Sequence, residues 1–211
     1  MVIDVGTGSG RAIARRVARE PRTLFVGVDA DASALSEVSR RAARSTARGG
    51  MPNTLFLAAS AEEMPGPLAG MADSITIVLP WGSLLRAVLE PDRAEFARVA
   101  AAAQPRAEIE ILISSTVRDA ASEGLVFDEP FAVRLAQRYG AAGFRVEQCR
   151  PASAADVHRL SSGWGQRLGI PERRQAWIYR LRLSCAGDQH SAGEWHADDQ
   201  HRAQRPERTV S

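Results

Sequence analysis

Three glycines at alternate positions, Gly6, Gly8 and Gly10, stand near the start of the chain. They follow the mainly apolar run Val2–Val5, which is typical of a buried strand, and a helical pattern begins directly after them. Because glycine has no Cβ, the backbone there can turn sharply and a ligand can approach it closely. A strand, a glycine turn and a helix in this order are the context of nucleotide-type cofactor sites. The spacing G-x-G-x-G, with Asp4 two residues earlier, differs from the dinucleotide pattern, and a turn without a ligand is the alternative interpretation.

A carboxylate at the end of the next apolar run supplies the second half of such a site. Residues 24–29 read Leu-Phe-Val-Gly-Val-Asp, which puts Asp29 nineteen residues after Gly10. In doubly wound folds an acidic residue about 20 positions on accepts hydrogen bonds from ribose hydroxyls. The alternative is that Asp29 or Asp31 caps the helix predicted to follow. Asp31 is the better placed cap, which leaves Asp29 for the ligand.

Two tryptophans in turn-like sequence could hold a flat ring. Trp81 follows Leu79-Pro80, where proline ends an apolar run, and Trp164 stands between two glycines and is predicted to lie in a loop. A nucleobase stacked on such rings gains about 1–3 kcal/mol per partner, which offsets the few kcal/mol needed to unstack it from RNA. The alternatives are packing at the edge of the core for Trp81 and ordinary surface packing for Trp164. Trp177 lies inside an apolar run and is predicted to belong to the core.

These residues must be positioned by strands that alternate with helices. Such alternation predicts an α/β fold with a mostly parallel sheet covered on both faces. The predicted strands are Val2–Val5, Thr23–Asp29, Thr54–Ala58, Ser74–Leu79, Glu108–Ser114, Phe144–Cys149 and Ala176–Leu183. The predicted helices are Arg11–Arg19, Ala32–Ala47, Ser83–Leu89, Arg93–Ala103, Phe131–Ala142 and Ala154–Leu160.

Length and composition are compatible with one such domain. The chain has 211 residues, of which 45% are hydrophobic, and its formal net charge is +2. We expect residues 1–185 to form a single domain and the polar, aperiodic residues 186–211 to form a disordered tail. Cys149 and Cys185 lie far apart without a nearby His or Cys cluster, so neither a metal site nor a disulfide framework is expected. No signal peptide or membrane-spanning apolar run is visible, which favours a cytoplasmic protein without membrane contact.

An arginine run follows the second predicted strand. Arg40, Arg41, Arg44 and Arg48 recur at helical spacing, so that three of them would share one side of a helix. Each could neutralise a nucleic-acid phosphate, and binding of that kind weakens steeply with salt. A solvated helix face is the common alternative for such a run.

Four segments together resemble one family of enzymes. They read Asp-Val-Gly-Thr-Gly-Ser-Gly at 4–10, Gly-Val-Asp-Ala-Asp at 27–31, Leu-Pro-Trp-Gly-Ser-Leu-Leu-Arg at 79–86 and Ser-Gly-Trp-Gly-Gln-Arg-Leu at 162–168. The first is common to class I S-adenosylmethionine-dependent methyltransferases, and the third is much more specific. Residues 2 to about 183 thereby resemble the kanamycin–apramycin resistance methyltransferases, which modify N1 of adenine 1408 in 16S rRNA. The resemblance implies S-adenosylmethionine as cofactor, S-adenosylhomocysteine as product and a seven-stranded sheet of order 3-2-1-4-5-7-6.

The resemblance also assigns roles to individual residues. The cofactor pocket would contain Asp4, Gly6, Gly8, Asp29, Ala61, Glu62 and the backbone around Leu79 and Ser83. Trp81 and Trp164 would enclose the flipped adenine, with Ser162 lining the same pocket. Phosphates of the rRNA would be held by Arg40, Arg41, Arg44, Arg167, Arg173 and Arg174. The family also implies a short N-terminal extension with a β-hairpin, whereas Met1 here stands directly before the first predicted strand.

The implied reaction needs alignment more than acid–base chemistry. Amino-methyltransferases of nucleic acids carry a polar residue where this chain has Leu79, and Leu79 cannot accept a hydrogen bond from an exocyclic amine through its side chain. This favours methylation of a ring nitrogen, whose lone pair is already nucleophilic, so no general base is assigned. We expect a monomer that acts on the 30S subunit and gives aminoglycoside resistance. A small-molecule methyltransferase and a non-catalytic RNA-binding relative remain the alternatives.

Overall fold

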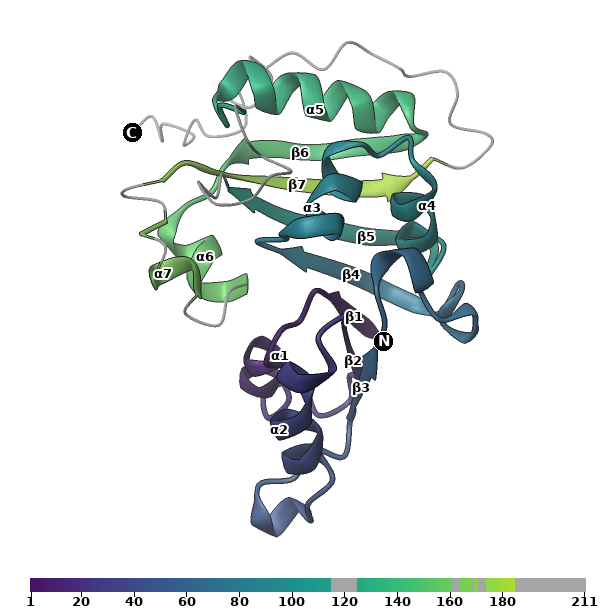
Figure 1. Cartoon of the computed structure of the whole chain (residues 1–211), viewed down its shortest axis with the longest axis vertical. Helices are drawn as coiled ribbons and strands as arrows, with labels where there is room; N and C mark the ends of the chain where they lie inside the picture. Colours follow the sequence, from purple (N-terminus) through teal and green to yellow (C-terminus); the bar gives the residue numbers. More distant parts are fainter. Residues whose placement is uncertain (115–124, 161–163, 168, 171–173, 185–211) are drawn as a thin grey trace, which may run out of the picture.

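A computed structural model describes residues 1–114, 125–160, 164–167, 169–170 and 174–184. Its seven strands form one sheet in the order β3-β2-β1-β4-β5-β7-β6 (Figure 1). They are β1 (Val2–Val5), β2 (Phe25–Asp29), β3 (Thr54–Ala58), β4 (Ala72–Val78), β5 (Ala103–Ser114), β6 (Phe144–Pro151) and β7 (Ala176–Leu183). Strand β7 runs antiparallel to β5 and β6, and the other pairs are parallel. The predicted α/β class and strand order are therefore confirmed.

Helices cover both faces of this sheet. Their bounds are α1 (Arg11–Arg16), α2 (Ala32–Ala42), α3 (Gly82–Leu89), α4 (Ala94–Ala100), α5 (Glu129–Ala141), α6 (Ala154–Leu160) and α7 (Trp164–Arg167), with short 3-10 turns η1 (Thr46–Arg48), η2 (Ala61–Glu63) and η3 (Gly66–Leu68). Helices α3, α4 and α5 pack on one face of the sheet in the largest apolar cluster. On the opposite face, α1 and α2 cover β1 and β2, and α6 covers β5 and β7. Among the described residues, no helix is long and apolar enough to cross a membrane.

Several local predictions were wrong. Strand β5 begins at Ala103 rather than at Glu108. Helix α2 ends at Ala42 rather than at residue 47, because the chain folds back and the N–H of Met51 donates to the Ala42 carbonyl. Arg44 therefore lies beyond the helix, and Arg48 lies in η1, so the arginine run does not share one helical face. Residues 164–167 form helix α7 rather than a loop. The predicted tail from residue 186 onward lies outside the described residues.

The connections after β1, β2, β3 and β4 meet at the carboxyl edge of the sheet. From β1 the chain builds β2 and β3 on one side, and it then crosses back to build β4 on the other side of β1. In open α/β sheets, ligands bind outside the carboxyl ends of the strands at such a switch point. This edge contains most of the residues that the sequence predicts for cofactor and substrate.

Candidate active site

The glycine turn after β1 is held against the end of β2. The backbone N–H of Gly8 donates to Asp29 Oδ2 at 2.6 Å, and the N–H groups of Gly6 and Thr7 donate to the Val28 carbonyl. Gly6 and Gly8 have φ angles of 74° and 56°, which side-chain-bearing residues rarely adopt. A Cβ on Gly6 would lie 2.7 Å from a methyl group of Leu84 in α3. The turn therefore requires glycine and brings β1, β2 and α3 together.

Asp29 and Asp31 divide the two roles that the sequence left open. Asp31 caps α2 by accepting hydrogen bonds from the N–H groups of Ser33 and Ala34, as predicted. Asp29 is not a helix cap, but it is already engaged with two backbone donors, Gly8 and Asp31. A carboxylate can accept about four hydrogen bonds, so Asp29 retains capacity for a pair of ligand hydroxyls.

Asp4 is buried and is hydrogen-bonded to the glycine turn. Its two oxygens accept hydrogen bonds of 2.7 Å from the hydroxyls of Thr7 in the turn and Thr76 in β4. Burial raises the pKa of Asp4 above its ordinary value, although both hydroxyls oppose that shift. Both oxygens are thus engaged within the protein, and a direct contact between Asp4 and a cofactor stays a prediction. The two threonines were missed by the sequence analysis, although Thr7 lies inside the glycine motif.

Ala61, Glu62 and Ser83 lie together on the other side of the edge. Ala61 is buried in the large core cluster, which fixes η2. The pKa of Glu62 is lowered by its own backbone N–H and then by the hydroxyls of Ser60 and Ser83, which outweigh partial burial. The influence of Ser83 on this pKa indicates that the connection after β3 lies close to the first turn of α3. The predicted cofactor residues thus lie in or just after four parallel strands that end at the same edge of the sheet, and their binding of a cofactor stays a prediction.

Trp81 stands out from the turn that connects β4 to α3. Leu79, two residues before Trp81, and Gly82, directly after it, have φ angles of 51° and 60°, and the backbone of Trp81 itself is extended. Its side chain is 77% exposed, so packing at the core edge is excluded for Trp81. Trp177 is buried and donates its indole N–H to the Phe127 carbonyl at 3.0 Å, which confirms the prediction that it belongs to the core.

The second predicted stacking residue lies in α7. The backbone of Trp164 begins this helix, whereas its side chain and the whole of Ser162 lie outside the described residues. Helix α7 follows α6, and the N–H of Ile170 donates to the Gly165 carbonyl in α7 at 3.1 Å. Packing of Ile170 in the α6 cluster thus supports a helix that Gly165 disfavours locally. The enclosure of a base between two indoles stays a prediction.

The predicted phosphate-binding arginines are mostly on the surface. Arg40, Arg41 and Arg44 are exposed at the end of α2, and Arg167 is exposed in α7. Arg174 is half-buried, and Arg173 lies outside the described residues. The first two also occupy the last turn of α2, where a cation stabilises the negative end of the helix dipole.

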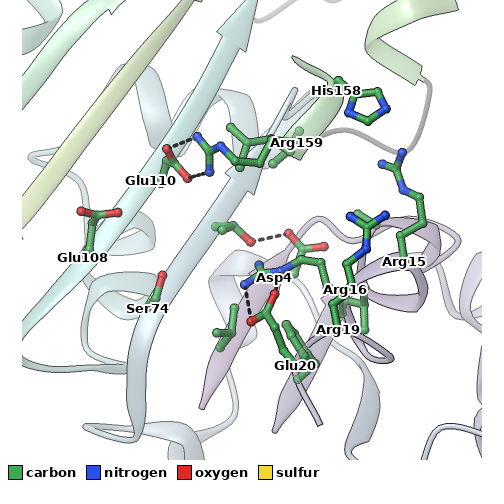
Figure 2. Close-up of a pocket in the computed structure, with 17 residues that line it drawn as sticks. Asp4, Arg15, Arg16, Arg19, Glu20, Ser74, Glu108, Glu110, His158 and Arg159 are labelled. Atoms are coloured by element: carbon green, nitrogen blue, oxygen red, sulfur yellow. Dashed lines mark hydrogen bonds and ion pairs between the residues drawn. The ribbon is translucent and has the colours of Figure 1, made fainter. Parts of the chain in front are cut away.

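A separate pocket of about 520 Å³ lies on the sheet face between α1 and α6 (Figure 2). Alternate residues of β1, β4 and β5 line it, and Asp4 is the one predicted cofactor residue among them. Figure 2 shows Arg159 of α6 bonded through both guanidinium ends to Glu110 of β5, at 2.7 and 2.8 Å. Burial raises the pKa of Glu110, but Arg159 and Arg180 outweigh it and hold the pKa below its ordinary value. This ion pair anchors α6, and the sequence analysis missed it because its members are 49 residues apart.

The sheet order, the glycine turn beside Asp29 and the exposed aromatic residue after β4 define a class I methyltransferase. The profile of the NpmA family, described as 16S rRNA (adenine(1408)-N(1))-methyltransferase, matches residues 1–182. The chain belongs to this family.

Named relatives agree with this assignment. The chain is 34% identical over 179 residues to the 16S rRNA (adenine(1408)-N(1))-methyltransferase of Streptoalloteichus hindustanus, with 82% of each chain covered. It is 31% identical over 181 residues to the enzyme of that name from Escherichia coli, again with 82% of each covered. A crystal structure of a variant of the enzyme of that name from Catenulisporales acidiphilia with cosubstrate SAM has a TM-score of 0.77 and 30% identity, and covers 89% of this chain and 87% of that one.

Proposed function

We propose that this protein transfers a methyl group from S-adenosylmethionine to N1 of adenine 1408 in 16S rRNA of the 30S subunit, and that it does so as a cytoplasmic monomer. The observation that carries the proposal is the exposed Trp81 in the turn after β4, at the same carboxyl edge of the sheet as the glycine turn and Asp29. A stacking surface at the carboxyl edge of the sheet suits a flipped base, and membership of the family supplies the identity of that base.

The residues at the edge fit the proposed cofactor. Asp29 has acceptor capacity for ribose hydroxyls, and Gly8 leaves open space, since a Cβ built on it would meet nothing within 4 Å. Ala61 and Glu62 would flank the adenine ring, while the backbone at Leu79 and Ser83 would hold the methionine end. Bound S-adenosylmethionine supplies an electrophilic methyl sulfonium.

On the substrate side, the chain has to align the base and exclude water. Trp81 stacks on the flipped adenine, and in the proposal Trp164 covers the other face while Ser162 lines the pocket. The N1 lone pair lies in the ring plane and needs no deprotonation, so positioning alone can supply about 7–11 kcal/mol of the barrier reduction. This agrees with the absence of a histidine from the described residues at the predicted edge, since His158 lies in α6 beside the separate pocket.

Docking on the subunit would use two groups of arginines. Arg40, Arg41 and Arg44 lie at the C-terminal end of α2, toward the segments that precede β2 and β3. In the proposal, Arg167, Arg173 and Arg174 form the second group. Arginine binds phosphate through two parallel hydrogen bonds, which gives it geometric as well as charge specificity. Several such contacts would make binding strongly dependent on salt.

Primer extension across 16S rRNA tests the proposal. We incubate 30S subunits with the protein and S-adenosylmethionine, and use S-adenosylhomocysteine in place of the cofactor as the control. A stop at adenine 1408 that requires S-adenosylmethionine is the expected result, together with resistance to kanamycin and apramycin in expressing cells. A stop at another base, or methyl transfer that does not need ribosomes, would contradict it. Affinity for 30S subunits without measurable S-adenosylmethionine binding would indicate the non-catalytic alternative.

A further inference from the structure

Leu79 has a backbone conformation that is unusual for its residue type. Its φ angle is 51°, and Arg106 is the other non-glycine residue with a positive φ among those the structure describes. Left-handed geometry brings the Cβ of an L-residue close to the following carbonyl oxygen, and Pro80 restricts the preceding residue further. Such a conformation persists only where the surrounding structure holds it in place, and this often occurs at functional sites.

The conformation changes the face to which the Leu79 side chain belongs. Successive side chains of a strand point to opposite faces. Ile75 and Ile77 accordingly lie in the cluster beneath α3, α4 and α5, and Val78 packs against the α6 cluster on the other face. Continued alternation would put Leu79 with Ile77. Instead Leu79 is 7% exposed within the α6 cluster, on the same side as Val78.

The α6 cluster connects the end of β4 to α7. It contains Leu79, Leu112 of β5 and Ile170, together with residues of α6 and β7. The N–H of Leu79 donates to the Leu112 carbonyl at 2.7 Å, and Ile170 is bonded to Gly165 in α7. Figure 1 shows α6 and α7 beside the carboxyl ends of β4 and β5. One buried side chain thus ties the turn that carries Trp81 to the element that contains Trp164.

We propose that Leu79 is a positioning residue, whose left-handed backbone turns its side chain into the α6 cluster and so fixes the Trp81 turn relative to α7. This inference rests on the proposed function, in which Trp81 aligns the adenine. In this role the Leu79 side chain touches neither cofactor nor base. The reaction would depend on it because a displacement of about 1 Å in an aligned substrate can lower the rate by about a hundredfold.

Substitutions that differ in branching at Cβ separate this role from simple packing. Ile and Met are both apolar and similar in volume to Leu, but a β-branched residue is a genuine outlier at positive φ. Leu79→Ile should therefore displace the turn, whereas Leu79→Met can keep it. Leu112→Ile is the matched control, since it introduces the same branched side chain into the same cluster from a regular strand. Leu79→Gly keeps the turn without strain but removes the anchor.

Two readouts are needed for each variant. The first is kcat and KM for methylation of 30S subunits. The second is the ¹⁹F spectrum of protein labelled with 5-fluorotryptophan. The protein has four tryptophans, and the Trp81 resonance is assigned from the spectrum of Trp81→Phe. We expect kcat of Leu79→Ile to fall at least tenfold below that of Leu79→Met, with a shifted or broadened Trp81 resonance. Leu112→Ile should leave that resonance in place, and Leu79→Gly should broaden it and lower kcat.

Other results would overturn the inference. Equal kcat and equal Trp81 resonances for Leu79→Ile and Leu79→Met would do so, as would an equal disturbance from Leu112→Ile. If Leu79→Ile does not fold, a Trp81 resonance in Leu79→Gly that matches wild type would also reject it. Failure of the proposed function is seen separately, because wild-type protein would then not methylate 30S subunits while the resonance comparison still tests the position of Trp81.

Discussion

Replacement of Trp81 by alanine isolates the stacking step, because this side chain contributes little to folding. The indole is 77% exposed, and surface substitutions of that kind usually change stability by less than about 0.5 kcal/mol. The residue also takes no part in the hydrogen bond that joins Gly8 to Asp29. We therefore expect Trp81→Ala to fold normally and to bind S-adenosylmethionine with an affinity within about twofold of wild type.

The catalytic effect follows from the energy of one stacked base. Stacking contributes about 1–3 kcal/mol by alanine substitution. Since about 1.4 kcal/mol corresponds to a factor of ten, kcat/KM for 30S subunits should fall by about 5- to 150-fold from this loss alone. Loss of alignment at N1 adds to it, so transfer should be nearly abolished. Trp81→Phe, which retains an aromatic face of smaller area, should lie between the two.

The assay is methyl transfer to purified 30S subunits, read by primer extension at adenine 1408, with cofactor affinity measured by titration calorimetry. Met71→Ala is the matched control, since Met71 is 49% exposed just before β4, at the opposite end of the strand from Trp81. Unchanged kcat/KM in Trp81→Ala would refute the stacking role. A parallel loss of cofactor affinity would show that Trp81 supports the cofactor pocket instead.

Three further perturbations test the rest of the site. Gly6→Ala should reduce both cofactor affinity and melting temperature more than Gly8→Ala does. A Cβ at position 6 would lie 2.7 Å from a side chain of α3, whereas a Cβ at position 8 would meet nothing within 4 Å. Similar losses in the two variants would contradict this prediction. The double variant Arg40→Glu, Arg41→Glu should bind 30S subunits more weakly and with a smaller dependence on salt concentration. An unchanged salt dependence would show that the two arginines do not contact phosphates. Glu110→Gln should destabilise the fold by about 1 kcal/mol at pH 7, since it removes the buried carboxylate that Arg159 and Arg180 share, while these partly exposed arginines keep solvent contact and longer ion pairs with Asp156 and Glu108. Because the folded-state pKa of Glu110 is below the ordinary 4.5, its stabilisation is complete above that pH and is lost as the pH falls further, so the melting-temperature gap between variant and wild type should narrow in acid.

Much of the fold could be predicted from the sequence because buried parallel strands leave a strong local signal. The apolar runs that form β1, β3 and β7 were bounded correctly, and Asp31 was recognised as the cap of α2 from its place before a helical pattern. Strand order is a different matter, since no periodicity encodes which strands are neighbours. It was predicted from the family resemblance, which itself depended on a few short motifs.

The errors arose where contacts distant in sequence decide local structure. The glycines beside Trp164 favour a loop, but Ile170 packs into the α6 cluster and holds that segment as a short helix. The helical spacing of the arginines suggested one continuous face, but the return of the chain toward β3 ends α2 at Ala42. The bond between Arg159 and Glu110 could not be found from spacing, because nothing in either local sequence marks the partner.

The conformation of Leu79 shows why a site can be recognised before its geometry can be predicted. The sequence identifies the turn, since Pro80 ends the strand and Trp81 follows it. It does not indicate that Leu79 leaves the alternation of β4, because a leucine at that position satisfies an apolar cluster on either face of the sheet. The choice between faces is made by the φ angle, and that angle depends on the α6 cluster being present to receive the side chain. The alignment of Trp81 therefore depends on residues about 90 positions later in the chain, such as Ile170, and variants in that cluster are expected to alter methyl transfer without touching the base.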